Sequence, residues 1–157
     1  MNNTENSKKA KLYKFCAYRE RSVAEVKQYA LKTGIDNDKI EYFINDLTTQ
    51  GFIDEYRFAS SFVKGKMNVN KWGKYKIIAK LREKGVDDNI INKVINEFYD
   101  DFYMDILERL ILKKINTIKN KETDCNVYIK LMRYALSKGF EKDSINLVIK
   151  NRVLSNK

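Results

Sequence analysis

Histidine and proline are absent from this sequence of 157 residues, and cysteine occurs only twice. Without histidine, the chain lacks the commonest general base and the commonest zinc ligand. Cys16 and Cys125 are too few and too far apart for a zinc site, and we expect both thiols to be buried and reduced inside helices. The absence of proline, with only six glycines, is expected of a chain made mostly of helices with few long loops.

Long apolar runs and catalytic motifs are also absent. No segment approaches the roughly 20 apolar residues that span a bilayer, and the polar residues 1–11 lack the apolar core of a signal peptide. We therefore expect a cytoplasmic protein with no membrane partner. Neither a Gly-x-x-x-x-Gly-Lys-Ser/Thr loop nor a Gly-x-Gly-x-x-Gly turn occurs, and no metal-ligand spacing is present. These absences favour a non-enzymatic protein without a cofactor or a metal.

Positive charge is in excess. The chain has 31 Lys and Arg against 21 Asp and Glu, a formal net charge of +10. An excess of this size favours a polyanionic partner, which could be nucleic acid, an acidic protein surface or an anionic membrane. Basic solvated surfaces are common in bacterial proteins, so charge alone does not choose between a binding role and simple solubility.

Three segments of the chain repeat one another without gaps. Gly34, Gly85 and Gly139 align, and each is followed by an apolar residue and then by an acid. The acids are Asp36, Asp87 and Glu141. The aligned apolar positions are Val26, Ile77 and Leu131; Ala30, Leu81 and Ala135; Ile35, Val86 and Phe140; Ile40, Ile91 and Ile145; Phe43, Val94 and Val148; and Ile44, Ile95 and Ile149.

The repeated pattern predicts a helix, a glycine turn and a second helix. Apolar positions four residues apart share one helical face. Glycine suits the left-handed position just after a helix, and the acid suits the start of the next helix, where the helix dipole favours negative charge. A further helix is predicted before each pair. The segments are about 11–20, with Leu12, Phe15 and Cys16 inward; a helix capped by Asp54, with Phe58, Phe62 and Val63; and about 98–119, with Phe102, Ile106, Leu110 and Leu112. The Ser22 and Glu25 pair forms a predicted capping box.

The sequence therefore predicts an all-α fold of three tandem three-helix, helix-turn-helix-like repeats in an elongated or curved array. A three-helix module of about 45 residues is marginal alone, so neighbouring modules should pack on one another. The predicted boundaries are a flexible basic N-terminus at 1–10 and repeats at 11–50, 51–97 and 98–157. Residues 67–73 form the clearest internal loop.

The positive charge is concentrated in the middle repeat. Between residues 61 and 86, eight lysines and arginines face a single acid, Glu83. Lys76, Lys80 and Lys84 are spaced four residues apart and would form one ridge, where like charges repel unless an anionic partner covers them. Beside the ridge, Trp72 and Tyr75 could stack on bases or pack on a protein. The alternative is a solvated lysine face with the tryptophan anchored in the core.

Two other charged stretches are present. The N-terminal region carries a second basic cluster of Lys8, Lys9, Lys11, Lys14, Arg19, Arg21 and Lys27. The acidic stretch consists of Glu97, Asp100, Asp101, Asp105 and Glu108. It could repel nucleic acid, pair with Arg109 and Lys113, contact another part of the chain, or simply be a solvated helix start.

The central motif resembles the signature of the RecX family. The matching positions are Gly51, Phe52, Ile53, Asp54, Arg57, Phe58, Ala59, Phe62 and Val63. Downstream, Gly73, Ile77, Leu81, Lys84, Gly85 and Val86 resemble the second-repeat helix of that family and its Lys-Gly-Val turn. Upstream, Arg19, Glu20, Arg21, Ser22 and Glu25 resemble its Arg-Glu-x-Ser-x-x-Glu segment. The similarity covers roughly residues 11–152 and agrees with the threefold repeat.

This resemblance implies a protein that binds along the groove of the RecA–DNA filament, and we expect it to be a monomer. It also implies that the protein restrains the recombinase, ATPase and SOS coprotease activities of RecA. The candidate contact residues are Lys64, Lys66, Lys71, Trp72, Lys74, Lys76, Lys80, Arg82, Lys84, Arg57, Arg19 and Arg21. Lys64, Lys66 and Lys76 stand where the family has arginine, so they can neutralise phosphate but lose bidentate geometry.

Three alternatives remain open from the residues themselves. The chain could be a sequence-tolerant protein that binds single- or double-stranded DNA directly and acts without RecA, or an adaptor for another acidic protein. Arg57 could pair with Asp54, three residues earlier, or reach a partner.

Overall fold

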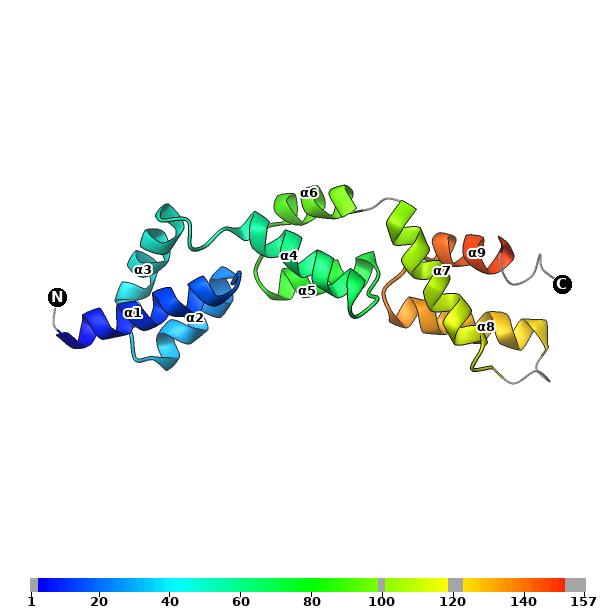
Figure 1. Cartoon of the computed structure of the whole chain (residues 1–157), viewed down its shortest axis with the longest axis horizontal. Helices are drawn as coiled ribbons and strands as arrows, with labels where there is room; N and C mark the ends of the chain where they lie inside the picture. Colours follow the sequence, from blue (N-terminus) through cyan, green and yellow to red (C-terminus); the bar gives the residue numbers. More distant parts are fainter. Residues whose placement is uncertain (1–2, 99–100, 119–122, 152–157) are drawn as a thin grey trace. The chain divides into compact units, whose positions relative to one another are not determined.

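The computed structural model describes residues 3–98, 101–118 and 123–151. In these ranges the chain forms nine α-helices and no strand, which confirms the predicted all-α class (Figure 1). The helices are α1 (Asn3–Tyr18), α2 (Val23–Lys32), α3 (Asn37–Thr49), α4 (Glu55–Asn68), α5 (Lys74–Glu83), α6 (Asp88–Phe98), α7 (Asp101–Ile115), α8 (Asp124–Ser137) and α9 (Lys142–Ile149). None of the helices in the described ranges has the length and apolar character needed to cross a bilayer.

The threefold repeat is a repeated helix-turn-helix. Gly34, Gly85 and Gly139 have φ angles of 78°, 75° and 92°, the left-handed region that glycine adopts without strain. After each glycine, the next amide donates to the carbonyl five residues earlier, which is the Schellman arrangement that ends a helix. The N···O distances are 3.0 Å from Ile35 to Ala30, 3.2 Å from Val86 to Leu81 and 3.2 Å from Phe140 to Ala135. Every aligned apolar position of the repeat is buried, with at most 6% of its surface exposed.

Two predicted helix starts have the expected capping geometry. The amide of Glu25 donates to Ser22 Oγ at 3.2 Å, and the amide of Ser22 donates to Glu25 Oε2 at 3.1 Å, so the capping box is complete. At the start of α4, the amide of Arg57 donates to Asp54 Oδ1 at 2.9 Å. These bonds satisfy amides that have no partner inside the first turn of a helix.

The first helix starts earlier than predicted. Residues 3–10, predicted as a flexible terminus, form the first half of α1. Lys8 Nζ donates to the carbonyl of Gly34, and Lys9 Nζ lies 2.9 Å from Asp46 Oδ2. The polar start of α1 therefore has partners far along the chain. The spacing of apolar residues in the sequence cannot reveal such contacts. The predicted loop at 67–73 is also shorter, because α4 continues to Asn68.

For α7, the sequence prediction placed two residues on the buried face that are in fact exposed. Phe102 and Leu112 are 46% and 37% exposed, whereas Ile106 and Leu110 are buried as predicted. Tyr103, Leu107 and Ile111 complete the buried face. The predicted set included residues on either side of the buried face of the helix. Every residue from 110 to 112 is apolar, so the sequence pattern does not show which of them face the core.

The two cysteines have different environments. Cys16 is buried in α1, and burial raises the pKa of its thiol to about 11. Cys125 is exposed in the first turn of α8, so the expectation that both thiols are buried was wrong for this residue.

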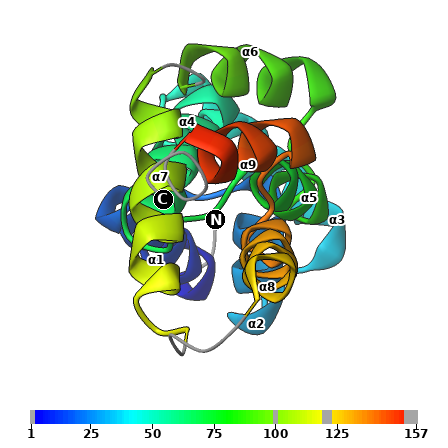
Figure 2. The same cartoon turned by 90° about the vertical axis from the view of Figure 1, so that its right-hand side faces the viewer.

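The described helices belong to two compact units. Among the described residues, one consists of 3–62 and 81–92, and the other of 63–80, 93–98, 101–118 and 123–151. The core of the first unit includes Leu12, Val26, Phe43 and Leu47. In the second unit, α7, α8 and α9 pack against one another in all three pairs (Figure 2).

Within the second unit, the start of α5 lies against the turn between α8 and α9. Two amides at this start donate to the turn, Gly73 N to Lys138 O at 2.8 Å and Tyr75 N to Gly139 O at 3.0 Å. The amide between them, Lys74 N, donates to Tyr103 Oη of α7 at 3.1 Å. The Tyr103 hydroxyl in turn donates to Glu141 Oε2 at 2.6 Å. Glu141, the acid of the third repeat, therefore orients Tyr103, whose hydroxyl accepts a hydrogen bond from the start of α5.

This approach requires two glycines. A Cβ atom at Gly73 would overlap the backbone of Gly139 and Phe140, and a Cβ atom at Gly139 would overlap Lys76. By contrast, a Cβ atom at Gly85 would have no neighbour within 4 Å. Gly139 therefore combines the left-handed turn of the repeat with a close backbone contact, while Gly85 has only the first role.

Candidate functional site

The candidate basic residues fall in both compact units and have different surroundings in each. In the second unit, Lys66 of α4 and Lys76 of α5 lie beside the ring of Trp72, which comes from the loop between these helices. The ammonium groups are 5.0 Å and 4.9 Å from the ring centroid. We call these three residues the Trp72 cluster. Cation–π contacts at this distance hold both ammonium groups at the surface next to the indole.

The fold fixes the position of the Trp72 cluster. The indole is half-buried, and the backbone amide of Trp72 donates to the carbonyl of Lys66 at 3.1 Å. Lys76 Nζ also donates to the carbonyl of Ser137, the last residue of α8, at 3.3 Å. The backbone of α5 starts against the α8–α9 turn. The position of Lys76 is therefore fixed by the packing of this backbone as well as by the contacts of its side chain. Tyr75, the other aromatic candidate, is 61% exposed and its ring is outside the cluster.

The remaining candidates of the second unit surround this cluster in the sequence. Lys64 is exposed on α4, and Lys71 is exposed in the loop, where its Nζ donates to the carbonyl of Asn68 at 2.5 Å. Lys71 has a φ of 54°, a left-handed conformation that is uncommon for a residue with a side chain. Lys74 and Lys80 are half-buried on α5.

In the first unit, the candidate cations are engaged by carboxylates of the chain itself. Arg57 Nε lies 2.9 Å from Glu20 Oε1, and its Nη2 donates to the carbonyl of Gly51 at 2.8 Å. Asp54 Oδ2 lies 3.8 Å from Arg57 Nη1, which is one of the two alternatives considered for Arg57, and Glu20 is the nearer partner. Arg82 Nε lies 2.7 Å from Asp88 Oδ1.

Glu25 joins two more candidates. Its Oε1 lies 3.1 Å from Lys84 Nζ and 3.3 Å from Arg19 Nη2, while its Oε2 accepts the capping bond from Ser22. Burial disfavours the charged form, but the hydrogen bonds from Lys84 and from the Ser22 backbone outweigh it and hold the pKa of Glu25 below its usual value. We call Arg19, Glu25 and Lys84 the Glu25 network.

These contacts change the interpretation of the lysine ridge. Lys84 lies one residue beyond the end of α5, binds Glu25, and sits 5.9 Å from the ring centroids of both Phe58 and Phe62. The ridge of Lys76, Lys80 and Lys84 stays a prediction, but Lys84 has neighbours in space that come from elsewhere in the chain. Its ammonium has a structural role.

Arg21 is also held inside the first unit. Its guanidinium carbon lies 3.8 Å above the centroid of the Phe15 ring, and its Nε donates to the Phe15 carbonyl at 3.2 Å. The Phe15 ring stacks in parallel on Tyr29 with a centroid distance of 4.0 Å. Partial burial in this stack lowers the pKa of Arg21 from its usual value.

The acidic stretch is only partly described. Asp100 lies outside the described residues, and the side chain of Asp101 is not among those described. Asp105 Oδ2 lies 3.7 Å from Arg109 Nη2, one turn later on α7, which is one of the pairings considered for this stretch. Both side chains are largely exposed, so the pair contributes little to stability.

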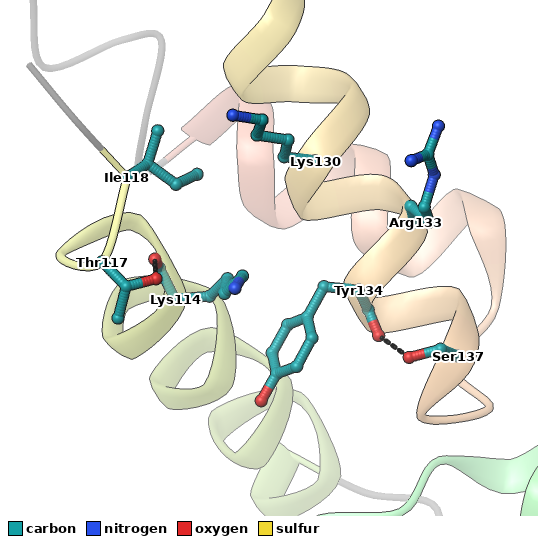
Figure 3. Close-up of a pocket in the computed structure, with 7 residues that line it drawn as sticks. All are labelled: Lys114, Thr117, Ile118, Lys130, Arg133, Tyr134 and Ser137. Atoms are coloured by element: carbon teal, nitrogen blue, oxygen red, sulfur yellow. Dashed lines mark hydrogen bonds between the residues drawn. The ribbon is translucent and has the colours of Figure 1, made fainter. Parts of the chain in front are cut away.

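Sequence reasoning missed a cavity between α7 and α8 in the second unit (Figure 3). Its volume is about 730 Å³, and its lining residues come from the end of α7 and from α8. They are Lys114, Thr117, Ile118, Lys130, Arg133, Tyr134 and Ser137. The basic positions are spread over twenty residues of sequence, so no local motif marks them. Across the described ranges, no three His, Cys, Asp or Glu side chains gather as a metal site would require.

Comparison with known proteins places the helices in a family. A model described as RecX, second three-helix domain, matches residues 54–95, a range that begins at Asp54 within the central motif. The curated protein "Regulatory protein RecX" of Clostridium tetani is 30% identical over 142 residues, which are 90% of this chain and 64% of that protein. The protein of the same name from Oceanobacillus iheyensis is 30% identical over 135 residues, 86% of this chain and 49% of its own length. The chain thus spans about half to two thirds of the length of these relatives.

Solved structures extend the likeness to the whole set of helices. The crystal structure of RecX from Lactobacillus salivarius has a TM-score of 0.86 and 25% identity, and the match covers 98% of this chain and 99% of that chain. A second crystal structure, of regulatory protein RecX, has a TM-score of 0.81 at 20% identity over 92% of this chain and 72% of that one, which supports the fold. The central motif, the sequence similarity across all three glycine turns and this fold agree, so the chain is similar to RecX proteins over nearly its whole length.

Proposed function

We propose that this protein is a non-enzymatic, cytoplasmic regulator that binds the RecA filament on DNA and restrains recombination, ATPase and SOS coprotease activity. The observation that carries the proposal is the structural match to a RecX over 98% of this chain and 99% of the other. The curated relatives that span most of the chain carry the name "Regulatory protein RecX". The net charge of +10 suits a partner that is a protein–DNA filament.

We place the principal contact with the filament at the Trp72 cluster, together with Lys64 and Lys71. The cluster presents two ammonium groups close to one indole, a combination that suits phosphates with a neighbouring base or an acidic protein surface. Arg19, Arg57 and Lys84 contribute less to binding in this proposal, because carboxylates of the chain already neutralise them.

The decisive assay is the DNA-dependent ATPase activity of RecA. The activity should fall at protein concentrations too low to coat the DNA, because a filament regulator acts on RecA rather than by covering the substrate. Trp72 is the only tryptophan of the chain, so its fluorescence should change on binding to the filament. If the ATPase activity falls only at concentrations that coat the DNA, the protein acts as a DNA-binding protein without RecA.

A double variant tests the position of the contact. Lys66→Gln with Lys76→Gln should weaken filament binding, and the log–log salt slope should fall by about 2 if both lysines neutralise phosphates. Lys142→Gln, on the exposed side of α9, is the matched control and should bind as the unaltered protein does. If the two lysines meet acidic side chains of RecA, filament binding should fall while binding to bare DNA hardly changes. Unchanged binding to both targets would remove the Trp72 cluster from the site.

The second candidate function is direct, sequence-tolerant binding to single- or double-stranded DNA without RecA. The observation that favours it is again the indole with two ammonium groups beside it, a combination similar to the stacking and charge neutralisation of single-strand binding proteins. This function predicts equal effects of the double variant on bare DNA and on the filament, and it predicts no effect on RecA below coating concentrations.

A further inference from the structure

The cavity between α7 and α8 has the size and chemistry of a ligand site. Its volume of about 730 Å³ falls within the range of roughly 300–1,000 Å³ that is usual for small-molecule pockets. One wall is apolar, formed by Ile118 and the ring of Tyr134, which turns toward α7 (Figure 3). Inorganic phosphate alone would fill only a small part of this volume and would leave that wall without a partner.

The other groups that line the cavity are mostly cationic. Lys114 comes from α7, Lys130 and Arg133 come from α8, and the Arg133 side chain points away from the Tyr134 ring (Figure 3). Among the described residues that line the cavity, none has a carboxylate. Lys114 Nζ lies 5.1 Å from the centroid of the Tyr134 ring, and Lys138 Nζ lies 5.9 Å from the same ring. A bound anion would relieve the repulsion between these neighbouring charges.

Two hydroxyl groups add directional hydrogen bonding. Thr117 Oγ1 donates to the carbonyl of Lys114, and Ser137 Oγ donates to the carbonyl of Tyr134, both at 2.7 Å. Each hydroxyl hydrogen is therefore used inside its own helix turn, and the oxygen lone pairs remain as acceptors. Acceptors suit amino or hydroxyl groups of a ligand, and they do not suit a second phosphate. The cavity thus combines cations for an anion, an aromatic surface and acceptors for donor groups.

We propose that this cavity binds a nucleotide. Lys114 and Lys130 hold the phosphates, with Arg133 contributing from the rim. The base lies against Tyr134 and Ile118, and its amino group or the sugar hydroxyl donates to Ser137 or Thr117. A free nucleoside triphosphate and one nucleotide of a single strand share this chemistry. The site is separate from the Trp72 cluster and requires no RecA, so it goes beyond the function proposed above.

The test uses the full chain without RecA and compares three probes by NMR and calorimetry: dATP, an oligodeoxyadenylate of about eight nucleotides, and inorganic triphosphate. Signals of the Tyr134 ring and the Lys114 side chain should shift with a nucleotide probe. Tight binding of dATP identifies a site for free nucleotides, and binding of the oligonucleotide alone identifies a site for single strands. Both outcomes support the proposal, and inorganic triphosphate should bind at least tenfold more weakly than the nucleotide probe that binds.

Variants then locate the site. Lys114→Gln with Lys130→Gln should weaken nucleotide binding by at least tenfold, whereas Lys113→Gln, one residue away on the exposed side of α7, should leave it unchanged. Tyr134→Leu should weaken binding by about 5- to 100-fold through the lost stacking, and Tyr134→Phe should keep it. The phenylalanine variant also shows whether a loss in Tyr134→Leu comes from stacking or from folding, with circular dichroism as the control.

Three results would overturn the proposal. The first is that neither dATP nor the oligodeoxyadenylate binds. The second is binding of inorganic triphosphate as tight as that of the nucleotides, because the base would then contribute nothing. The third is nucleotide binding that the Lys114, Lys130 and Tyr134 variants do not change. None of these results bears on the RecA assay, so failure here is distinguishable from failure of the proposed function.

Discussion

Because Gly73 and Gly139 lie in close contact, we expect alanine substitutions at different glycines to lower the free energy of unfolding by different amounts. Gly85→Ala places a side chain in the left-handed region without any steric neighbour, which should lower the free energy of unfolding by roughly 1–2 kcal/mol. Gly139→Ala adds an overlap with Lys76 to the same backbone penalty. Overpacking of this kind typically costs about 1–3 kcal/mol, so the total should be about 2–5 kcal/mol.

Gly73→Ala isolates the contact from the backbone conformation. Gly73 is not among the glycines with a positive φ, so alanine there meets only the overlap with the α8–α9 turn, a loss of about 1–3 kcal/mol. Because Gly73 and Gly139 form one contact, the double variant should lose less than the sum of the two single losses. Additive losses would mean that the two glycines do not share a contact.

Urea unfolding followed by circular dichroism gives the free energies, and amide hydrogen exchange shows where the loss occurs. Exchange of the Gly73 and Tyr75 amides should speed up in both the Gly73→Ala and the Gly139→Ala variants, because their acceptors are at the displaced turn. Gly85→Ala should leave these amides protected. The reasoning is refuted if Gly139→Ala is no more destabilising than Gly85→Ala and leaves the exchange of these amides unchanged.

Four further predictions concern buried and charged side chains. Leu81 is fully buried, so Leu81→Ala should lower the free energy of unfolding by about 2–5 kcal/mol in a urea titration, and a loss below 1 kcal/mol would contradict its place in the core. Lys84→Gln should cost about 1 kcal/mol by removing the partner of Glu25. Because the pKa of Glu25 is lowered by folding, its contribution is present above its unfolded value of about 4.3 and is lost as the pH falls through the folded value. Unfolding midpoints measured from pH 7 to pH 3 should therefore decline less in Glu25→Gln than in the unaltered protein. The hydroxyl of Tyr13 donates to Asp46 and, with Lys9, lowers the pKa of Asp46 to about 2; an NMR titration should show this value rising in Tyr13→Phe, and an unchanged value would exclude the hydrogen bond as its cause.

The repeat could be predicted from the sequence because its signals are local. The period of buried positions and the glycine after each helix depend on residues within about ten positions of one another, and the structure confirms both at Gly34, Gly85 and Gly139. The phase of α7 was harder to predict, because its apolar residues are nearly continuous. Tyr103 is fully buried through its contacts with α5 and Glu141, which a helical pattern cannot contain.

The candidate site could be predicted only as a set of residue types. The sequence shows that Lys84 lies in a basic stretch, but its partner Glu25 is 59 positions away, and Glu20 and Arg57 are 37 positions apart. These ion pairs arise from tertiary packing, so a count of charges along the chain overstates the cations available to a partner. The same reason hides the cavity between α7 and α8, whose two sides meet only after the helices pack.

The hydrogen bonds at the start of α5 also determine how the protein can be divided for experiments. A fragment that ends at residue 97, the predicted boundary of the middle repeat, would lose the acceptors of three amides at residues 73–75. Its α5 would begin with donors that only water could satisfy, and the support of Lys76 by Ser137 would be lost with them. A fragment that keeps residues 63–151 together retains these bonds. Truncation at the repeat boundaries therefore separates segments that the sequence repeat suggests are independent but that share their hydrogen bonds.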